Sequence, residues 1–292
     1  MSNDKKISQS QRERLVYIEL RLKYLGEICR RDLEERFGIQ SAAASRDMAL
    51  YKEMAADNVD YDTSQKRYVM SDNFLDTFTT APERVMSWLS QGIGDYEPGS
   101  VKGHIPSLTL GRLDQPDLDQ IATITRAIHK EKAIQIGYRS LTSGLSSREL
   151  VPHALVDNGL RWHVRGFDRK SGEFRDFILS RIDGAVEMNE AIKDEENIQA
   201  DNQWNRIVDL ELAPHPINVA FAETIEHEYG MTNGSMKIPV RAAVAGYFLR
   251  KLNVDCSAMH KLKGFEYQLW LINTPTLYGV TNLSIAPGYG LE

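Results

Sequence analysis

The sequence predicts an α+β protein built from several domains. Its 292 residues exceed what one hydrophobic core commonly organises, so two or three domains are expected. Near the N-terminus apolar residues recur at helical spacing, whereas strand-like runs dominate from residue 134 to residue 182. The chain is 42% apolar and 26% charged, which is typical of a globular protein.

The first 72 residues follow the element order of a winged helix-turn-helix. Residues 8–25 and 30–37 predict two helices, and residues 41–55 predict a third helix after a short turn. Two short strands around a polar turn at 63–66 complete the order. We therefore expect a DNA-binding domain over residues 1–72.

The third predicted helix has one apolar face and one slim, polar face. Ala44, Met48 and Tyr51 can pack on the first two helices, which turns the slim face outward. The major groove admits a helix whose leading turn is narrow. The expected DNA contacts are Arg12, Gln40, Ser41, Ala42, Ser45, Arg46, Lys66 and Arg67. The alternative is a three-helix module that binds protein.

The net charge of −6 does not exclude a nucleic-acid partner. Residues 1–70 carry 13 Lys or Arg against 12 Asp or Glu, a net of +1, so the rest of the chain carries −7. Charges are screened over about 8 Å at physiological salt, so a distant acidic domain has little effect on a basic surface. The local charge of the N-terminal domain is therefore compatible with binding to DNA.

Three further regions follow along the chain. Residues 73–133 are mostly helical in pattern and predict a helical linker. Strands dominate as far as residue 182, within a domain expected over residues 134–190, and an acidic, weakly patterned stretch at 183–201 is expected to be a solvated linker. Residues 205–292 mix strands and helices and predict a small α+β domain.

Residues 159–182 are typical of a β-hairpin with a cationic face. Arg161, His163 and Arg165 alternate along one strand, so their side chains share a face, and a four-residue turn places Arg165 opposite Asp176. Arginine offers a rigid charged fork that suits phosphate. The core-forming face is expected to hold Trp162, Val164, Phe177 and Leu179. The alternative is a solvated face with Arg165 tied to Asp176, which is worth only about 0–1 kcal/mol.

Two segments of this hairpin, RWHVRGFD and FRDFILSRI, resemble the signature of WYL domains, in which a Trp-Tyr-Leu triplet lies on a strand. Here the triplet is Trp162-His163-Val164. The upstream segments IGYRS and LVPHALV are also similar to elements that precede the triplet. Together with the winged helix and the C-terminal module, the resemblance covers essentially the whole chain. It points in particular to the BrxR/CapW-type repressors associated with bacterial phage-defence islands.

The resemblance implies a homodimer that binds an inverted-repeat DNA operator and represses a neighbouring operon; the two widely separated cysteines fit a cytoplasmic location. It implies a small Sm-like (SH3-like) β-barrel at 134–190 that senses an anionic or nucleotide-like effector, and a C-terminal WCX-like dimerisation domain at 205–292. The pocket residues carried over by position are Tyr138, Ser140, His153, His163, Arg165 and Arg181, to which the cationic face adds Arg161.

No pattern in the sequence indicates an enzyme, a cofactor or a metal. The chain lacks a P-loop, a GxGxxG after a strand, HExxH and a GxSxG elbow. Cys29 and Cys256 are far apart, which fits a reducing compartment and argues against a zinc site. No apolar run reaches the roughly 20 residues that span a bilayer. A single-strand nucleic-acid-binding effector without operator specificity is the alternative function.

Overall fold

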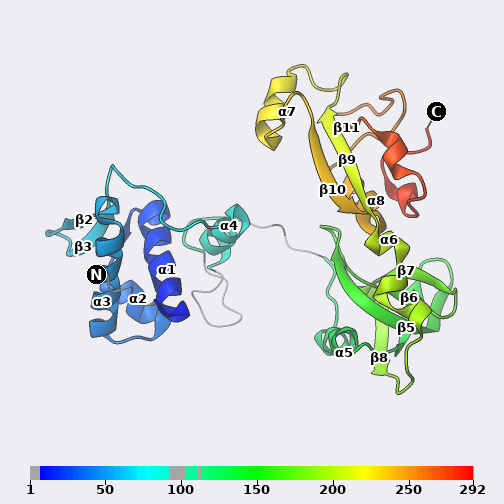
Figure 1. The fold of residues 1–292 in the computed structure, drawn as a ribbon, viewed down its shortest axis with the longest axis horizontal. Coiled ribbons are helices and arrows are strands. Elements are labelled where there is room, and N and C mark those ends of the chain that lie inside the picture. Colours follow the sequence, from blue (N-terminus) through cyan, green and yellow to red (C-terminus); the bar gives the residue numbers. More distant parts are fainter. Residues whose placement is uncertain (1–6, 93–102, 109, 111–112, 292) are drawn as a thin grey trace, which may run out of the picture. The chain divides into compact units, whose positions relative to one another are not determined.

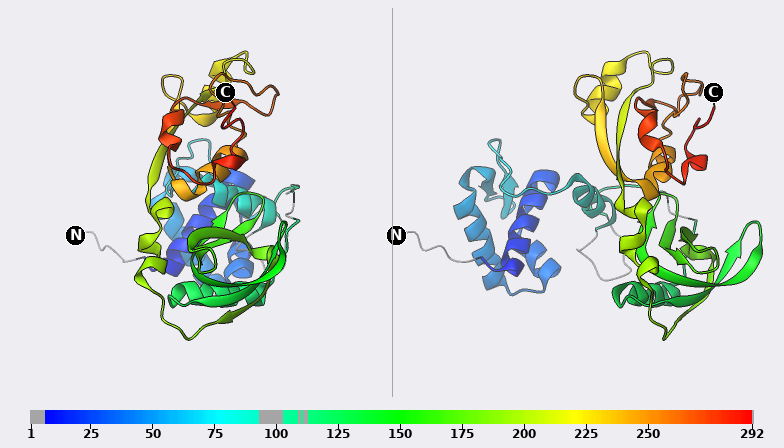
Figure 2. Two further views of the ribbon diagram at one scale, coloured as in Figure 1. Left: turned by 90° about the vertical axis from the view of Figure 1, so that its right-hand side faces the viewer. Right: turned by 45° about the vertical axis from the view of Figure 1, so that its right-hand side comes forward.

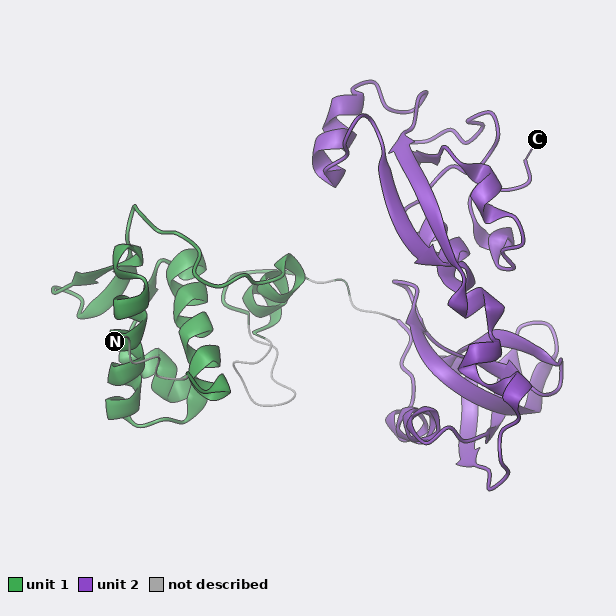
Figure 3. Ribbon diagram, in the orientation of Figure 1, with its two compact units in different colours: residues 1–111 green, residues 112–292 purple. Residues whose placement is uncertain are grey.

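The computed structural model describes residues 7–92, 103–108, 110 and 113–291. The chain divides into two compact units, residues 1–111 and residues 112–292 (Figure 3). Each unit has its own hydrophobic core. Among the described residues, no helix is both long and apolar enough to cross a membrane.

The first unit begins with three helices, α1 (Gln9–Leu25), α2 (Arg30–Phe37) and α3 (Ser41–Met54) (Figure 1). The Ser8 side chain caps α1 by accepting a hydrogen bond from the Gln11 backbone. Gly38, with φ at 60°, ends α2 in the left-handed conformation that L side chains avoid, and so permits the tight turn into α3.

The wing is a three-stranded antiparallel sheet with the order β1-β3-β2. Its strands are β1 (Glu27–Ile28), β2 (Val59–Asp62) and β3 (Arg67–Met70), and the turn between β2 and β3 falls at the predicted residues. The winged helix-turn-helix predicted from periodicity is therefore confirmed.

The core of the first unit joins the helices to the following segment. The predicted packing face of α3 is buried, with Ala44, Met48 and Tyr51 no more than 2% exposed. Glu19 of α1 is also buried, and its carboxylate accepts hydrogen bonds from the Tyr51 hydroxyl and from the backbone of residues 77 and 78. Glu19 therefore holds residues 77 and 78, in the segment that follows the wing, against α1.

The stretch 73–133 contributes a helix to each unit. Helix α4 (Pro82–Gln91) packs its buried Val85, Trp88 and Leu89 into the core of the first unit. Helix α5 (Leu118–His129) packs Ile124 and Ala127 into the core of the sheet that follows. Residues 93–102, 109 and 111–112, between the two helices, lie outside the described residues.

After α5, the second unit contains a curved antiparallel sheet (Figure 2). The sheet has five strands in the order β7-β6-β5-β4-β8. The sheet curls around the cluster that α5 completes. In the described part of the chain β7 and β8 are its edges, so the small predicted barrel is open between them. The strands are β4 (Ile134–Ser140), β5 (Gly144–Asp157), β6 (Trp162–Asp168), β7 (Glu173–Ile178) and β8 (Ile182–Glu187).

The hairpin register is the predicted one, because Arg165 of β6 lies opposite Asp176 of β7. Val164, Phe177 and Leu179 are buried, as expected for the core face. The core prediction is wrong for Trp162, which is 38% exposed. Trp162 is the first residue of β6, and the pairing of β6 with β7 begins only at the next residue, His163.

The prediction of a solvated linker at 183–201 is wrong at the two ends of the stretch, whereas residues 189–191 and 193–195 are exposed as predicted. Its first residues form β8, which pairs with β4. Further along, Glu196 is 2% exposed and Asp201 is 1% exposed. Arg169 binds the Glu196 carboxylate with two hydrogen bonds, which satisfies the buried charge. An acidic composition predicts a solvent-exposed stretch. Here Arg165 and Arg169 pair with Asp201 and Glu196, and this pairing allows the two carboxylates to be buried.

The C-terminal part of the second unit is a three-stranded sheet with helices against it (Figure 1). Strand β9 is central and pairs antiparallel with both β10 and β11. The core of this part includes the buried face of α8, with Ala242, Ala245 and Leu249. The elements are α6 (Asn202–Asn205), β9 (Ile207–Pro214), α7 (Ala222–Tyr229), β10 (Met236–Arg241), α8 (Ala242–Lys251) and β11 (Leu269–Leu271).

Candidate functional site

The first turn of α3 is exposed, as the sequence predicts. Gln40, Ser41, Ala42 and Arg46 are exposed, and Ser45 is half-buried. Arg46 makes no hydrogen bond or ion pair with the described residues, so its guanidinium is available to a partner. The two serines are oriented by α2, because Ser41 Oγ donates to Glu34 and Ser45 Oγ accepts from Arg30. Arg30 is therefore a cation beside this turn that sequence reasoning missed.

The predicted basic residues outside α3 differ in whether an acidic side chain pairs with them. Lys66 lies at the wing tip with φ at 56°, exposed and without an ion pair among the described residues. Arg12 on α1 is likewise exposed and unpaired in the described chain. Arg67 instead forms an ion pair with Glu27 on the neighbouring strand. Lys66 and Arg12 thus present free charge, and Arg67 braces the wing.

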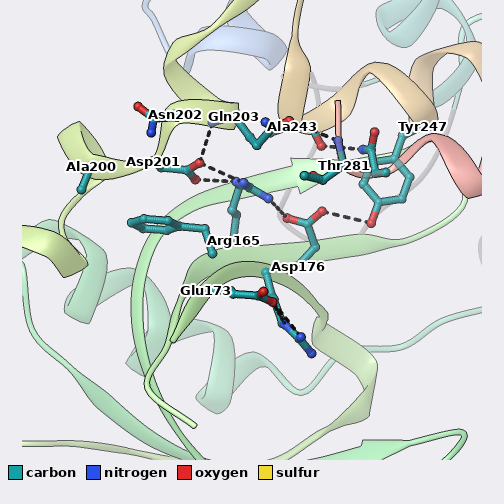
Figure 4. Close-up of a pocket in the computed structure, with 13 residues that line it drawn as sticks. Arg165, Glu173, Asp176, Ala200, Asp201, Asn202, Gln203, Ala243, Tyr247 and Thr281 are labelled. Carbon is teal, nitrogen blue, oxygen red and sulfur yellow. Dashed lines mark hydrogen bonds and ion pairs between the residues drawn. The ribbon is translucent and has the colours of Figure 1, made fainter. Parts of the chain in front are cut away.

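On the sheet of the second unit, Arg165 is the centre of a buried charged network (Figure 4). Its Nε and Nη2 atoms donate to the Asp201 carboxylate at 2.7 and 3.0 Å. Its Nη1 atom donates to Asp176 at 3.0 Å. Arg165 is 4% exposed. Burial by itself lowers the pKa of Arg165, but the hydrogen bonds and charges of Asp201 and Asp176 raise it overall, so the guanidinium stays charged.

A β-bulge brings His153 to the same carboxylate. The pairing of β5 with β6 shifts between Pro152 and Ala154, which leaves His153 as the extra residue and turns its side chain aside. His153 Nε2 lies 3.0 Å from Asp201 Oδ2. Gly166 permits this bulge, because a Cβ there would lie 2.4 Å from the Val151 carbonyl oxygen.

The network continues into the C-terminal part through Tyr247 of α8. The Tyr247 hydroxyl donates to Asp176 at 3.1 Å. Its ring lies against the ring of His163, with centroids 5.1 Å apart. Burial, with the charge of Asp176 beside it, raises the pKa of Tyr247, and burial lowers the pKa of His163. Both side chains are therefore neutral at pH 7. Their contact joins the sheet to α8.

A cavity of about 630 Å³ opens beside this network, within the range of small-molecule pockets. Arg165, Asp176, Asp201 and Tyr247 line it, together with residues from α6 and α8. Burial alone raises the pKa of Asp201, but hydrogen bonds from His153 and Arg165 lower it overall, so its charge persists. The guanidinium of Arg165 is thus already bound by two carboxylates of the chain itself, those of Asp176 and Asp201.

The structure brings together only some of the predicted pocket residues. His153, His163 and Arg165 belong to the network described above. Tyr138 packs edge-on against Phe177 in the core, and its hydroxyl accepts from the Ile178 backbone. The remaining predicted residues lie elsewhere: Ser140 at the end of β4, Arg161 in the β5–β6 turn and Arg181 in the short helical turn after β7.

Sequence reasoning missed Asp201 and Tyr247. Asp201 lies in the acidic stretch predicted to be a solvated linker, and Tyr247 lies in the C-terminal α+β domain, for which no pocket residue was predicted. The available signal was the number of arginines on the sheet, because buried arginines require carboxylate partners.

These features define a class of protein: a transcription regulator in which a winged helix-turn-helix is joined to a unit with a charged internal pocket. Comparisons with known families agree and are more specific. The winged helix-turn-helix domain of the BrxR transcriptional regulator matches residues 10–91, the WYL domain matches residues 119–187, and the BrxR C-terminal dimerization domain matches residues 207–277.

The chain belongs to the BrxR/CapW family of WYL-domain transcriptional repressors. It is 35% identical to the DNA-binding transcriptional repressor CapW of Escherichia coli (strain KTE188) over 277 residues, which is 92% of this chain and 91% of that protein. The CapW proteins of Stenotrophomonas maltophilia and Pseudomonas aeruginosa are each 34% identical, over 88% and 84% of this chain and 88% and 83% of their own. These relatives are regulators and not enzymes.

Among the solved structures that match is the proteasome accessory factor B/C (PafBC) of Arthrobacter aurescens. The identity is 19%, the TM-score is 0.29, and the match covers 82% of this chain and 43% of that chain. A TM-score this low contributes nothing to the assignment.

Proposed function

We propose that the chain is a homodimeric repressor of a phage-defence operon, which binds an inverted-repeat operator and responds to an anionic, nucleotide-like effector. The observation that carries the operator-binding part is the exposed, slim first turn of α3, followed by Arg46, which has no ion pair within the described part of the chain. The phage-defence part rests on the resemblance to BrxR/CapW-type repressors.

In this proposal α3 enters the major groove. Gln40, Arg46 and the two serines then face base edges or phosphates, and Ala42 allows close approach. Lys66 at the wing tip and Arg12 on α1 bind the flanking backbone. Arg67 acts indirectly, because its pair with Glu27 fixes the strand that carries the wing.

A dimer accounts for operator symmetry. The match of residues 207–277 to a dimerization domain supports pairing through the C-terminal part. Two winged helices related by a two-fold axis require two half-sites related by the same axis, commonly about one helical turn apart. The operator is therefore expected to be an inverted repeat.

The effector is proposed to act on the second unit, where the predicted residues are Tyr138, Ser140, His153, Arg161, His163, Arg165 and Arg181. The network of Arg165, Asp201, Asp176 and Tyr247 joins the sheet to the C-terminal part within this unit. A ligand that alters this network alters the geometry of the dimerisation part. Because coupling is reciprocal, an effector that releases DNA must bind the DNA-bound form less tightly.

Fluorescence anisotropy with a duplex from the region upstream of the chain's own gene tests the operator-binding part. Arg46→Ala is expected to weaken binding by about 1–3 kcal/mol, the range for one specific base contact. Arg84→Ala is the matched control, because Arg84 is exposed on α4 of the same unit. Equal affinity for scrambled duplexes or single strands would instead favour the single-strand effector.

A further inference from the structure

A recess with a concentrated positive charge lies between the β5–β6 turn and the last turn of α8. Its volume is about 350 Å³, and Arg161, Arg250 and Lys251 line it without any carboxylate. All three side chains are exposed, and none forms an ion pair with the described residues. Basic residues at the C-terminus of α8 complement the helix dipole, which accounts for Arg250 and Lys251. It does not account for Arg161, which comes from another element to the same recess.

The turn that carries Arg161 is held in a fixed conformation. The Asn158 side chain accepts hydrogen bonds from the Leu160 and Arg161 backbone N–H groups at 3.0 and 2.8 Å. Gly159 has φ at 86°, and a Cβ there would lie 3.0 Å from Cε of Lys251. The lysine chain therefore passes directly over the glycine. Arg161, Arg250 and Lys251 line the same recess, so their like charges repel one another unless an anion lies between them.

A second recess of about 260 Å³ adjoins the first and shares Asn158, Tyr247 and Lys251 with it. Its other walls are mostly apolar and include Val244 and Phe248 of α8, together with Trp204. Asp157 and Arg241 are its other charged residues, and the Arg241 guanidinium lies over the Trp204 ring, 4.7 Å from its centroid. One end of the combined groove thus suits a planar apolar group, and the other end suits a phosphate.

The neighbouring 630 Å³ cavity offers no comparable place for an anion. Its buried cation, Arg165, is bound by both Asp176 and Asp201. The exposed Arg175 on its rim is bound by Glu173. Free positive charge in this part of the molecule is therefore found beside the cavity, at Arg161, Arg250 and Lys251.

We propose that the groove between the β5–β6 turn and α8 binds a nucleoside monophosphate, with the phosphate on Arg161, Arg250 and Lys251 and the base against Phe248 and Val244. This proposal rests on the proposed function, since it gives the anionic effector a site and a chemical class. Tyr247 lines both this groove and the cavity of Arg165, and it donates to Asp176. Ligand in the groove therefore contacts the side chain that joins the sheet to α8.

Isothermal titration of the full-length protein with adenosine 5′-monophosphate, inorganic phosphate and adenosine tests the site. The monophosphate is expected to bind more tightly than either fragment. Arg161→Ala and Arg250→Ala should each weaken it about tenfold or more, the loss expected for one charged hydrogen bond. The control Arg175→Ala, an exposed arginine on the rim of the other cavity, should leave the affinity unchanged.

Two results would overturn the site: no heat from the monophosphate at millimolar concentration, or binding that depends on Arg175 and not on Arg161 and Arg250. Failure of the wider proposal has a different signature. If the monophosphate binds with the expected dependence but leaves operator affinity unchanged by anisotropy, the groove stands as a binding site and the effector role falls.

Discussion

Replacement of Asp201 by alanine is expected to destabilise the second unit strongly. The Asp201 carboxylate accepts two hydrogen bonds from Arg165, and it lies 3.0 Å from His153 Nε2. It also caps α6 by accepting from the backbone of Gln203 and Trp204. At 1% exposure none of these bonds is replaced by water without rearrangement.

The expected loss follows from these contacts. Breaking a buried ion pair from one side costs about 3–5 kcal/mol, because the remaining charge stays buried. Asp176 still pairs with Arg165, which moderates that cost, whereas loss of the α6 cap adds about 0.5–2 kcal/mol. The net expectation for Asp201→Ala is a loss of about 3–5 kcal/mol in the free energy of unfolding of this unit.

Urea denaturation followed by tryptophan fluorescence measures this loss. Three of the four tryptophans, Trp162, Trp204 and Trp270, belong to the second unit, so the signal reports mainly on its unfolding. Asp183→Ala is the matched control, because Asp183 pairs with Arg139 at the surface. That change is expected to cost less than about 1 kcal/mol. Equal losses for the two variants would refute the view that Asp201 anchors the network.

Three more outcomes are expected. Gly166→Ala forces a Cβ against Val151 at the bulge and should cost about 1–3 kcal/mol, measured by the same urea titration; an unchanged midpoint would contradict the bulge. Glu19→Leu leaves three donors without their acceptor and should lower the helical melting temperature seen by circular dichroism, with Glu13→Leu on the exposed face of α1 as the control. Acidification should destabilise the second unit in two stages. The folded pKa of His163 lies below its ordinary value, so its contribution is present above about pH 6.5 and declines as the pH falls below that value; that of Asp201 is lost below about pH 4. A urea midpoint that rises between pH 7 and pH 5 would show the opposite sign.

Local patterns predicted much of the fold. The helices of the first unit follow from apolar spacing, and the hairpin register follows from alternation and an even turn length, which together place Arg165 opposite Asp176. In each case the information lies within a few residues of the element concerned.

The parts of the candidate site that were missed depend on contacts between distant segments. Arg165 and Asp201 are 36 positions apart, and Asp176 and Tyr247 are 71 apart. The bulge that turns His153 toward Asp201 needs Gly166 on the opposite strand. No periodicity connects such positions, so charge composition alone made residues 183–201 resemble a solvated linker.

The chain between the sheet and the C-terminal part is held to the sheet region at two points, by the pair of Arg169 with Glu196 and by the pair of Arg165 with Asp201. An insertion or a protease site between residues 193 and 205 would require a buried arginine–carboxylate pair to break before this segment could change its conformation or be cleaved. Engineered fusions and cleavable tags are therefore better placed at exposed turns such as that at 141–143. In an evolving lineage, the same two pairs would restrict changes of length in this segment more strongly than its acidic composition suggests.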